Sequence, residues 1–494
     1  MQTYELFRTN AKDASRLAKE KEHEYRDAFQ RDRDRLLYST EFRRLSGKTQ
    51  LFVSGFDDNM RTRLTHTLEV AQISDTLARR LGLNDVLVEA IAYGHDVGHT
   101  PFGHVGERTL NHFVNGCDTF YDFNTDLIDS QRGFKHNLQS LVVAVKLEKI
   151  SNEYSGLNLT NYTLWGMQNH TKSTYGKCKF CVTGNNVCRF RYVNDKCPKR
   201  GNLGMGFYTE TLQQLARTFR VNEIVCDSKD WSFEGIIVAL ADEIAQRHHD
   251  VEDGLYAGIL DPAALLDKFQ SSFTTLIPKK TIHLFSNSLA SYKMNKNVSA
   301  FTKEILNFYC TTCIALIESK LNTICNDFKI VDTSSYLESR LDIYNWLRDG
   351  GRKSLSYESL LGKEFTDADE KFKSYISDII LKSDLAQRMD GKATYIIRKL
   401  YHAFLRNPQQ LPDKTLISVW ESFSNFAYRQ QSKKDKILVA SSARKAVDEA
   451  LKENSSEINE ILLRTVCDHI AGMTDNYALS QFKELYGANE FKNF

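Results

Sequence analysis

Apolar side chains recur every three or four residues along most of the chain, the spacing of one face of an α-helix. In one stretch they stand at Leu64, Leu68, Ala71, Ile73, Leu77 and Leu81. The same spacing is found at 86–93 (followed by Gly94), 233–253, 300–325, 372–388, 393–405 and 436–466. Alternation with a period of two, typical of strands, is scarce outside 178–193. The pattern predicts an all-α, mostly α-helical protein with one irregular insertion at about 172–206.

Composition supports this fold class. The 494 residues include only 6 prolines and 25 glycines, which favours long helices over short strands joined by turns. With 41% hydrophobic and 26% charged residues, the chain can bury one large core or about three domains. Boundaries are weakly marked. We predict a helical catalytic core over about 1–260, and a helical C-terminal region over 261–494 that completes the pocket and the oligomer contacts.

Charge and hydropathy narrow the classes of partner. The formal net charge is +2, so the whole molecule has no electrostatic preference for nucleic acid or membranes. The N-terminal segment is polar, without the apolar core of a signal peptide. No apolar run is long enough to span a bilayer. We therefore expect a cytoplasmic protein.

The strongest chemical signal is HDVGHTPFGHVGE, residues 95–107. It begins with His95 and Asp96, follows a helix that carries His66, and precedes a helix that carries Asp242. A single histidine or an isolated His-Asp pair is common by chance, but the combination is not. Two imidazoles and two carboxylates suit a divalent ion such as Mn²⁺, with Mg²⁺ an alternative and Zn²⁺ not excluded. Four protein ligands on a six-coordinate ion leave places for water and a phosphate oxygen.

Longer blocks of sequence carry a resemblance to a known family. They are FRRLSGKTQLF (42–52), RTRLTHTLEV (61–70), HDVGHTPFGHVGE (95–107), FKHNLQSL (134–141), ADEIAQRHHDVED (241–253) and HIAGMTDNYAL (469–479). In content and order these blocks resemble the deoxyguanosine triphosphate triphosphohydrolases (dGTPases), a family of the HD-domain phosphohydrolases. The resemblance implies a helical HD bundle that hydrolyses dGTP, or other dNTPs, at the α-phosphorus to a deoxynucleoside and tripolyphosphate.

The resemblance also implies roles for residues of this site. The family's metal ligands match His66, His95, Asp96 and Asp242. Its catalytic histidine and acidic partner match His104 and Glu107. The 5′-oxygen that leaves in this reaction needs a proton, and an imidazole with a pKa near about 6.5 can supply it. Whether His104 gives that proton or takes one from water stays open, and His99 and His136 are further candidates for phosphate contact or proton transfer.

Substrate contacts follow from the same resemblance. Arg63 stands three residues before His66 on one helix face, where a guanidinium can reach a phosphate, although most arginines are ordinary surface residues. His170 matches a residue that touches the phosphates. Positions that match the sugar pocket are Gln50, Leu51, Gln246 and Asp250, with Asp250 on the 3′-hydroxyl. This chain departs from the family at Gln246, where a tyrosine is usual, and a glutamine cannot stack on the sugar.

Four cysteines crowd the insertion: Cys178, Cys181, Cys188 and Cys197. Their spacing favours a structural zinc knuckle, with reduced thiols or redox-active cysteines as alternatives. The insertion is also basic and contains aromatic residues, which is typical of a binding site for single-stranded nucleic acid. A solvated flap beside a triphosphate pocket is the interpretation we favour. The insertion lies outside the family's blocks, so the resemblance does not decide between these.

Two competing functions remain. One is another HD hydrolase acting on nucleotides, although such enzymes lack the KTQ and AGMTD sequences. The other is a nucleic-acid-binding or regulatory protein that uses the HD site as a nucleotide sensor. For the leading hypothesis we expect dGTP or another dNTP as substrate, Mn²⁺ or Mg²⁺ as cofactor, and a homo-oligomer, because the family often forms multimers. No residue in the sequence specifies guanine.

Overall fold

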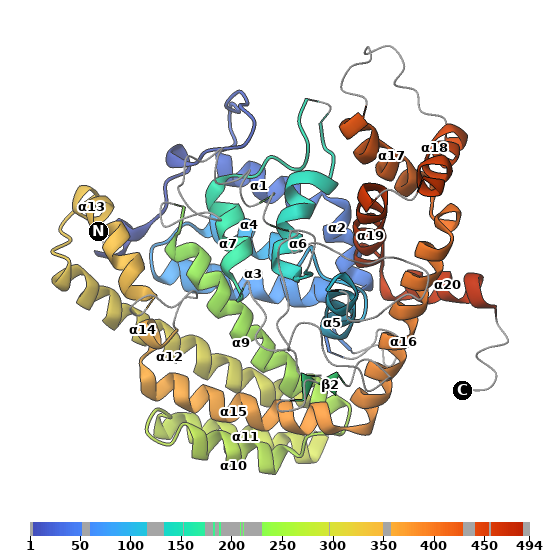
Figure 1. Cartoon of the computed structure of the whole chain (residues 1–494). Helices are drawn as coiled ribbons and strands as arrows, with labels where there is room; N and C mark the ends of the chain where they lie inside the picture. Colours follow the sequence, from blue (N-terminus) through green and yellow to red (C-terminus); the bar gives the residue numbers. More distant parts are fainter. Residues whose placement is uncertain are drawn as a thin grey trace. The chain divides into compact units, whose positions relative to one another are not determined.

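Helices make up most of the residues that the structure describes (Figure 1). The computed structural model describes residues 3–51, 60–115, 133–151, 153–172, 181–182, 187–188, 208, 211, 230–295, 297–348, 357–427, 440–453 and 456–487. Within these residues the β-structure is one antiparallel pair of two-residue strands, β1 (Cys181–Val182) and β2 (Val187–Cys188), with isolated bridges elsewhere. The predicted all-α fold is confirmed.

Contacts between Cα atoms divide the chain into two compact units. Unit 1 comprises Met1–Gly98, Asn137–Ser173 and Thr211–Met389, and unit 2 comprises His99–His136, Thr174–Glu210 and Asp390–Phe494. The units interleave along the sequence and neither ends near residue 260. Which part of the chain makes up a catalytic core, 1–260 in our expectation, stays a prediction.

Unit 1 contains most of the helices. They are α1 (Ala28–Leu37), α2 (Thr40–Arg44), α3 (Arg63–Arg80), α4 (Asp85–Gly94), α6 (His136–Val142) apart from its first residue, α7 (Asn161–Asn169), α9 (Phe233–Tyr256), α10 (Pro262–Ser272), α11 (Lys279–Asn295), α12 (Val298–Asp327), α13 (Thr333–Leu347), α14 (Tyr357–Leu361) and α15 (Lys363–Lys382). Helix α9 contacts α3, α4, α7, α12 and α15, and so forms the centre of this unit (Figure 1).

Unit 2 is built from later helices and one early helix. They are α5 (Gly103–Val114), α16 (Asp384–Arg406) from residue 390 onward, α17 (Asp413–Ala427), α18 (Ala440–Lys452), α19 (Ser456–Ala471) and α20 (Asp475–Tyr486). Helix α19 packs against both α17 and α5. A segment that follows residue 98 in the sequence therefore folds with the C-terminal hundred residues of the chain.

Three predicted features of the helices were wrong in detail. The predicted helix 372–388 spans a break at Ser383, whose backbone is extended and whose hydroxyl accepts a hydrogen bond from Ala386 N at 3.2 Å, capping α16. The predicted helix 436–466 is two helices, α18 and α19. Leu68, expected on the buried face of α3, is 46% exposed. That helix instead buries the face with Val70, Ile73 and Leu77, which is also the face of His66.

Glycines allow three helices of unit 1 to approach closely. A Cβ on Gly166 of α7 would lie 2.6 Å from the Ile91 side chain on α4. A Cβ on Gly235 of α9 would lie 2.6 Å from the ring of Trp165, which is fully buried. Loss of such a buried ring costs about 3–5 kcal/mol. This packing places α4, α7 and α9, each of which ends beside or carries a candidate site residue.

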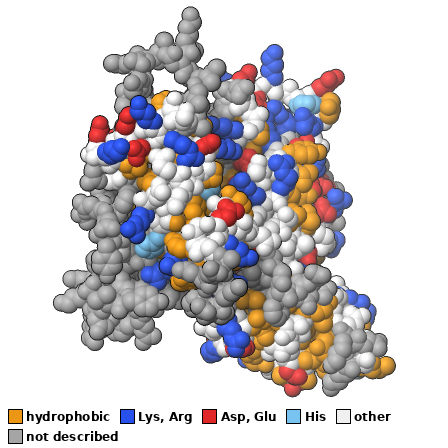
Figure 2. Space-filling view, turned by 90° about the vertical axis from the view of Figure 1, so that its right-hand side faces the viewer, with side chains coloured by type: hydrophobic (Ala, Val, Ile, Leu, Met, Phe, Trp, Pro, Cys, Tyr) orange, Lys and Arg blue, Asp and Glu red, His pale blue; other side chains and the backbone are white. Residues whose placement is uncertain are grey.

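The surface carries mixed charge. Figure 2 shows Lys and Arg side chains interspersed with Asp and Glu side chains on the face that it draws. This agrees with the net charge of +2. Among the helices that the structure describes, none combines the length and hydrophobicity needed to cross a membrane.

Candidate active site

The first turn of α3 positions two of the predicted site residues. Thr62 caps this helix through reciprocal hydrogen bonds with Thr65, so that helical backbone begins at Arg63. Arg63 and His66 are three residues apart and share a helix face, and both are buried. The Arg63 Nη1 donates to Asp96 Oδ2 at 2.5 Å. Its Nε and Nη2 are buried without a hydrogen-bond partner among the described residues.

The C-terminal end of α4 positions His95. Its Nδ1 lies 2.7 Å from the carbonyl oxygen of Ala92, an acceptor only, so Nδ1 carries the proton and Nε2 the lone pair. The turn that follows is held by Ser140, whose hydroxyl donates to His95 O at 2.8 Å and accepts from Gly98 N at 2.9 Å. His95 Nε2 is buried and has no hydrogen-bond partner within the described parts of the chain.

The fourth predicted metal ligand comes from α9. Asp242 Oδ1 lies 3.0 Å from His66 Nε2 and 3.8 Å from His95 Nε2, and Asp96 Oδ1 lies 3.8 Å from His95 Nε2. Burial would raise the pKa of Asp242, but the neighbouring imidazoles of His66 and His95 lower it below its usual value. The four residues predicted as ligands thus lie together in unit 1, with carboxylate oxygens facing imidazole nitrogens.

These residues fit a divalent ion. Ligand atoms of His66, His95 and Asp96 lie within 4.8 Å of one another, close enough to bind one ion. The lone pair of His95 Nε2 has no proton donor to satisfy it among the described residues, a cost that a cation would remove. Mixed nitrogen and oxygen donors suit Mn²⁺, Mg²⁺ or Zn²⁺, so the donors do not identify the metal.

The predicted contacts of unit 1 outside these helices are His170, Gln50 and Leu51. His170 is buried just after α7, with Nδ1 2.7 Å from Met167 O and its ring centroid 5.0 Å from that of His95. Gln50 and Leu51 are partly buried, and Gln50 Oε1 has no hydrogen-bond partner among the described residues. His170 is thus placed beside the four predicted metal ligands.

Asp242, Gln246 and Asp250 follow at four-residue intervals on α9 and line one side of it. All three are partly exposed, whereas most of their neighbours on the helix are buried. Burial raises the pKa of Asp250 to about 6, and the charge of Glu243 adds to this while Arg247 and Lys373 oppose it. A carboxyl group with this pKa is partly protonated near neutral pH and can both donate and accept.

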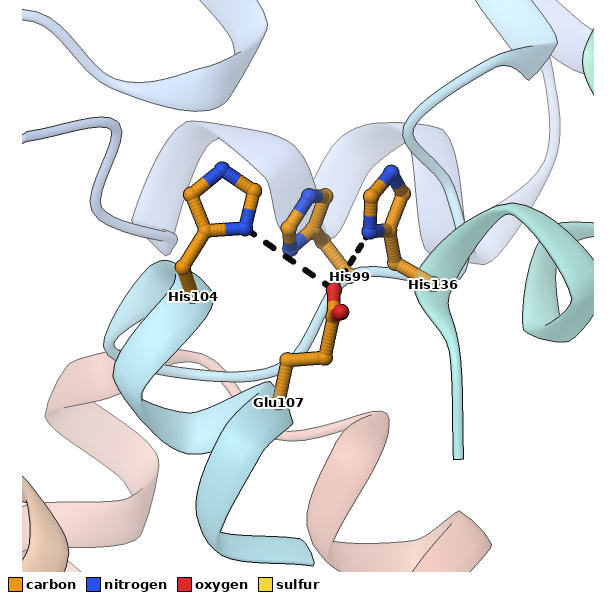
Figure 3. Close-up of side chains that lie close together, drawn as sticks. All are labelled: His99, His104, Glu107 and His136. Atoms are coloured by element: carbon orange, nitrogen blue, oxygen red, sulfur yellow. Dashed lines mark hydrogen bonds and ion pairs between the residues drawn. The ribbon is translucent and has the colours of Figure 1, made fainter. Parts of the chain in front are cut away.

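A second group of histidines lies in unit 2, around Glu107 of α5. Figure 3 shows His99, His104 and His136 converging on this carboxylate from three segments. His136 Nδ1 bonds to Glu107 Oε2, and Lys135 Nζ donates to Oε1 at 3.1 Å. The rings of His99 and His136 stack with centroids 4.0 Å apart. Burial would raise the pKa of Glu107, but the charges of His136 and Lys135 hold it well below its usual value.

His104 differs from its neighbours in exposure. Its side chain is 52% exposed, and its Nδ1 lies 3.9 Å from Glu107 Oε2. Glu107 is buried and makes its shorter contacts with His136 and Lys135. The carboxylate therefore holds a cluster of cationic or polar side chains, of which His104 is the most exposed.

The turn before α5 explains one of the family-like blocks. Phe102 has a φ of 60° and Gly103 a φ of 58°, so the chain enters the helix through two left-handed residues. Phe102 N donates to Asp475 Oδ1 at 2.8 Å, and Asp475 belongs to the AGMTD block at the start of α20. The buried Asp475 thus fixes the turn that carries His104, a structural role that the sequence did not reveal.

Several site residues were missed. His249 Nδ1 lies 3.0 Å from His66 Nδ1, and His249 Nε2 bonds to Glu69 Oε2. Burial lowers the pKa of His249 to about 3, so its ring is neutral. Lys135 and Ser140 were also missed. Both Glu69 and His249 stand inside blocks quoted above, but a contact between residues 180 positions apart leaves no spacing signal.

The described residues include only part of the cysteine cluster. Cys178 and Cys197 lie outside them, and Cys181 and Cys188 are described only as strand backbone, where they face each other in register. The zinc knuckle and the nucleic-acid-binding interpretation of the insertion stay predictions.

Comparisons with known proteins agree with the geometry. A family model described as "HD domain" matches residues 63–177, and one described as "Phosphohydrolase-associated domain" matches 360–429 and 437–484. Proteins named "Deoxyguanosinetriphosphate triphosphohydrolase-like protein" are similar over nearly the whole chain. That of Leptospira interrogans is 29% identical, covering 97% of this chain and 94% of its own length. That of Bordetella pertussis is 30% identical over 94% of this chain and 91% of its own.

Proposed function

The chain belongs to the HD-domain family of deoxyguanosinetriphosphate triphosphohydrolase-like proteins, and from that premise we propose that it hydrolyses dGTP to deoxyguanosine and tripolyphosphate. Membership supports a nucleotide phosphohydrolase. The observation that carries the proposal further is the cluster of His66, His95, Asp96 and Asp242. Among the described residues His95 Nε2 has no hydrogen-bond partner, and it lies 3.8 Å from an oxygen of each of the two carboxylates.

The reaction we propose is a displacement at the α-phosphorus. Water adds to phosphorus, the bond from phosphorus to the 5′-oxygen breaks, and the 5′-oxygen leaves with a proton as the hydroxyl of the nucleoside. The second proton of water and the three phosphates remain together as tripolyphosphate. A divalent ion at the HD site supplies Lewis acidity to a phosphate oxygen and favours ionisation of water.

The protein's own groups have separate tasks in this proposal. His104 transfers the proton, since it is the exposed histidine of its cluster, and Glu107 stabilises the charge on the neighbouring imidazoles. Arg63 bonds a phosphate oxygen through its Nε and Nη2, which have no hydrogen-bond partner in the described parts of the chain. His170 contacts the phosphates beside His95, and His99 and His136 are kept as further phosphate or proton-transfer groups.

We propose that a second set of residues recognises the sugar. Gln50 donates and accepts at the sugar through its amide, whose Oε1 has no hydrogen-bond partner among the described residues, and Asp250 bonds the 3′-hydroxyl. Leu51 packs against the 2′-carbon, so a ribose hydroxyl would be buried without a partner at a cost of about 1–3 kcal/mol. Gln246 replaces the tyrosine usual in the family. The chain therefore relies on hydrogen bonds where relatives also stack.

A nucleotide panel tests the proposal. Purified protein with Mn²⁺ or Mg²⁺ is expected to convert dGTP to deoxyguanosine and tripolyphosphate, with ¹⁸O from labelled water in the tripolyphosphate. Release of monophosphate or pyrophosphate would place the protein among other HD hydrolases. No turnover of any nucleotide, with nucleotide still bound, would support the sensor alternative and overturn the proposal.

Replacement of Leu51 tests sugar selection. Wild-type protein is expected to prefer dGTP over GTP by at least about tenfold in kcat/KM, which corresponds to 1.4 kcal/mol. Leu51→Gly opens the space at the 2′-carbon and lowers this ratio, whereas Leu51→Met retains bulk and leaves it near the wild-type value. An unchanged ratio in Leu51→Gly would remove Leu51 from the account.

A further inference from the structure

We infer that Glu69 and His249 are positioning residues that hold the imidazole of His66 in the tautomer able to bind a metal ion. This inference rests on the proposed metal site. Neither residue was assigned a role from the sequence, and neither touches the other three proposed ligands in any contact described above. They act on the site through His66 alone.

The inference involves four residues, two from each of two helices. Helix α3 carries His66 and Glu69, three residues apart, and α9 carries Asp242 and His249, seven residues apart. Spacings of three and seven return to the same face of a helix, and α3 and α9 are packed together. Asp242 lies at one nitrogen of His66 and His249 at the other, so the helix pair contacts both nitrogens of that ring.

The chain of hydrogen bonds from Glu69 to His66 determines which nitrogen of each imidazole carries the proton. An ionised Glu69 can only accept, so His249 Nε2 must carry the proton of their hydrogen bond. An imidazole whose single ring proton is on Nε2 presents a lone pair at Nδ1. His66 Nδ1, 3.0 Å away, must donate to it, which leaves the lone pair of His66 on Nε2. That nitrogen faces Asp242 Oδ1 at 3.0 Å, and two lone pairs so close require a cation between them.

Arg61 keeps Glu69 in the accepting state. Its Nε donates to Glu69 Oε1 at 3.0 Å, while its other nitrogens pair with Glu252 and Asp253. The same guanidinium argues against a second metal site at Glu69, His248 and His249, although these three could hold an ion by distance alone. An ion bound there would lie beside the positive charge of Arg61, which repels it.

The opposite tautomer would close the metal site. If His249 donated from Nδ1, His66 would accept at Nδ1 and carry its proton on Nε2. That N–H would bond Asp242 Oδ1 directly and occupy the lone pair that a metal needs. Residues that orient metal-bound histidines in this way typically contribute 10–100-fold to metal affinity.

Metal affinity tests the inference without reference to turnover. Mn²⁺ binding to the full-length protein is measured by equilibrium dialysis with metal analysis, alongside thermal unfolding. His249→Phe, which cannot accept the hydrogen bond from His66, and Glu69→Gln, whose amide can donate to His249, are each expected to weaken Mn²⁺ by about 10–100-fold. His249→Gln retains one acceptor and is expected to lose less than His249→Phe.

The matched control is His248→Gln. His248 is the neighbour of His249 on α9 and its Nδ1 lies 3.4 Å from the same Glu69 oxygen, but no contact with His66 is found for it in the described structure. It is expected to bind Mn²⁺ within about twofold of wild type, below the range for positioning residues. Wild-type affinity in folded His249→Phe and Glu69→Gln, with binding lost in Asp242→Ala, would overturn the inference alone. If wild type itself does not bind Mn²⁺, or Asp242→Ala binds as wild type does, the proposed metal site fails.

Discussion

Two clusters of this chain contain histidines and carboxylates, but their hydrogen-bonding patterns are opposite. Around Asp242 in unit 1, imidazole nitrogens face carboxylate oxygens, and His95 Nε2 has no donor beside it among the described residues. Around Glu107 in unit 2, the carboxylate is already bonded by His136 and Lys135. Both clusters have ligand atoms close enough for an ion, but Lys135 places a positive charge where an ion would contact Glu107.

The comparison shows that proton positions, more than residue types, distinguish a metal site from an acid–base site. Buried nitrogens with lone pairs attract a cation. A buried carboxylate surrounded by N–H groups instead stabilises cationic imidazoles, and an exposed member such as His104 can exchange protons with a ligand. Mutations in the unit 1 cluster should therefore affect metal binding, and mutations in the unit 2 cluster should affect proton transfer.

The largest effect is expected at the unit 1 cluster. Asp96→Ala removes a predicted ligand and the acceptor of Arg63, so turnover should fall to assay background and bound Mn²⁺ should be lost. Circular dichroism checks that the helices remain. Activity close to wild type in this variant would refute the metal assignment.

The second prediction separates the two clusters. His104→Ala should lower kcat by about 10²-fold or more, the usual contribution of a positioned acid–base group, while Mn²⁺ affinity stays near wild type. Single-turnover kinetics and dialysis provide the two readouts. If His104→Ala loses Mn²⁺ affinity but keeps the wild-type kcat, the roles proposed for the two clusters are wrong.

Metal removal gives a smaller, thermodynamic effect. A ligand that binds only the folded state stabilises it by about 2.7 kcal/mol at a concentration one hundred times its Kd. Mn²⁺ added to metal-depleted protein should therefore raise Tm, and Asp242→Ala should abolish the increase whereas Glu107→Gln should not. Equal increases in wild type and Asp242→Ala would place the ion elsewhere.

The smallest effect concerns acid stability. The folded-state pKa of Glu107 is depressed from 4.5, so its ionised form contributes stability above that pH, and this is lost as the pH falls through the folded-state value. Glu107→Gln should therefore unfold more easily than wild type at pH 7, with the difference narrowing below about pH 4.5. Glu449→Gln, at an exposed site of α18, provides the control. A difference that does not change with pH would indicate lost packing instead of lost charge.

Much of the fold could be predicted from the sequence, because helical periodicity is a local signal. The order of the His and Asp blocks predicts a ligand set, and the structure places His66, His95 and Asp242 together although 176 positions separate the first from the last. Their role as metal ligands stays a prediction. Finer features required coordinates. The exposure of Leu68 depends on which face of α3 meets α9, and the partner of Glu107 depends on the path of the chain after α5. The links from His249 and Asp475 are pairings at long range that no spacing rule predicts.

The close approach of α7 and α9 at Gly235 has a mechanical consequence. A helix is stiff along its axis and rises about 1.5 Å per residue, so Asp242 lies about 10 Å and His249 about 20 Å along the same rod from that contact. A methyl group at Gly235 would lie 2.6 Å from the Trp165 ring, and displacing the rod to relieve that overlap carries both residues with it. The tolerance of this site to mutation is thus set partly at a glycine that touches none of its chemistry.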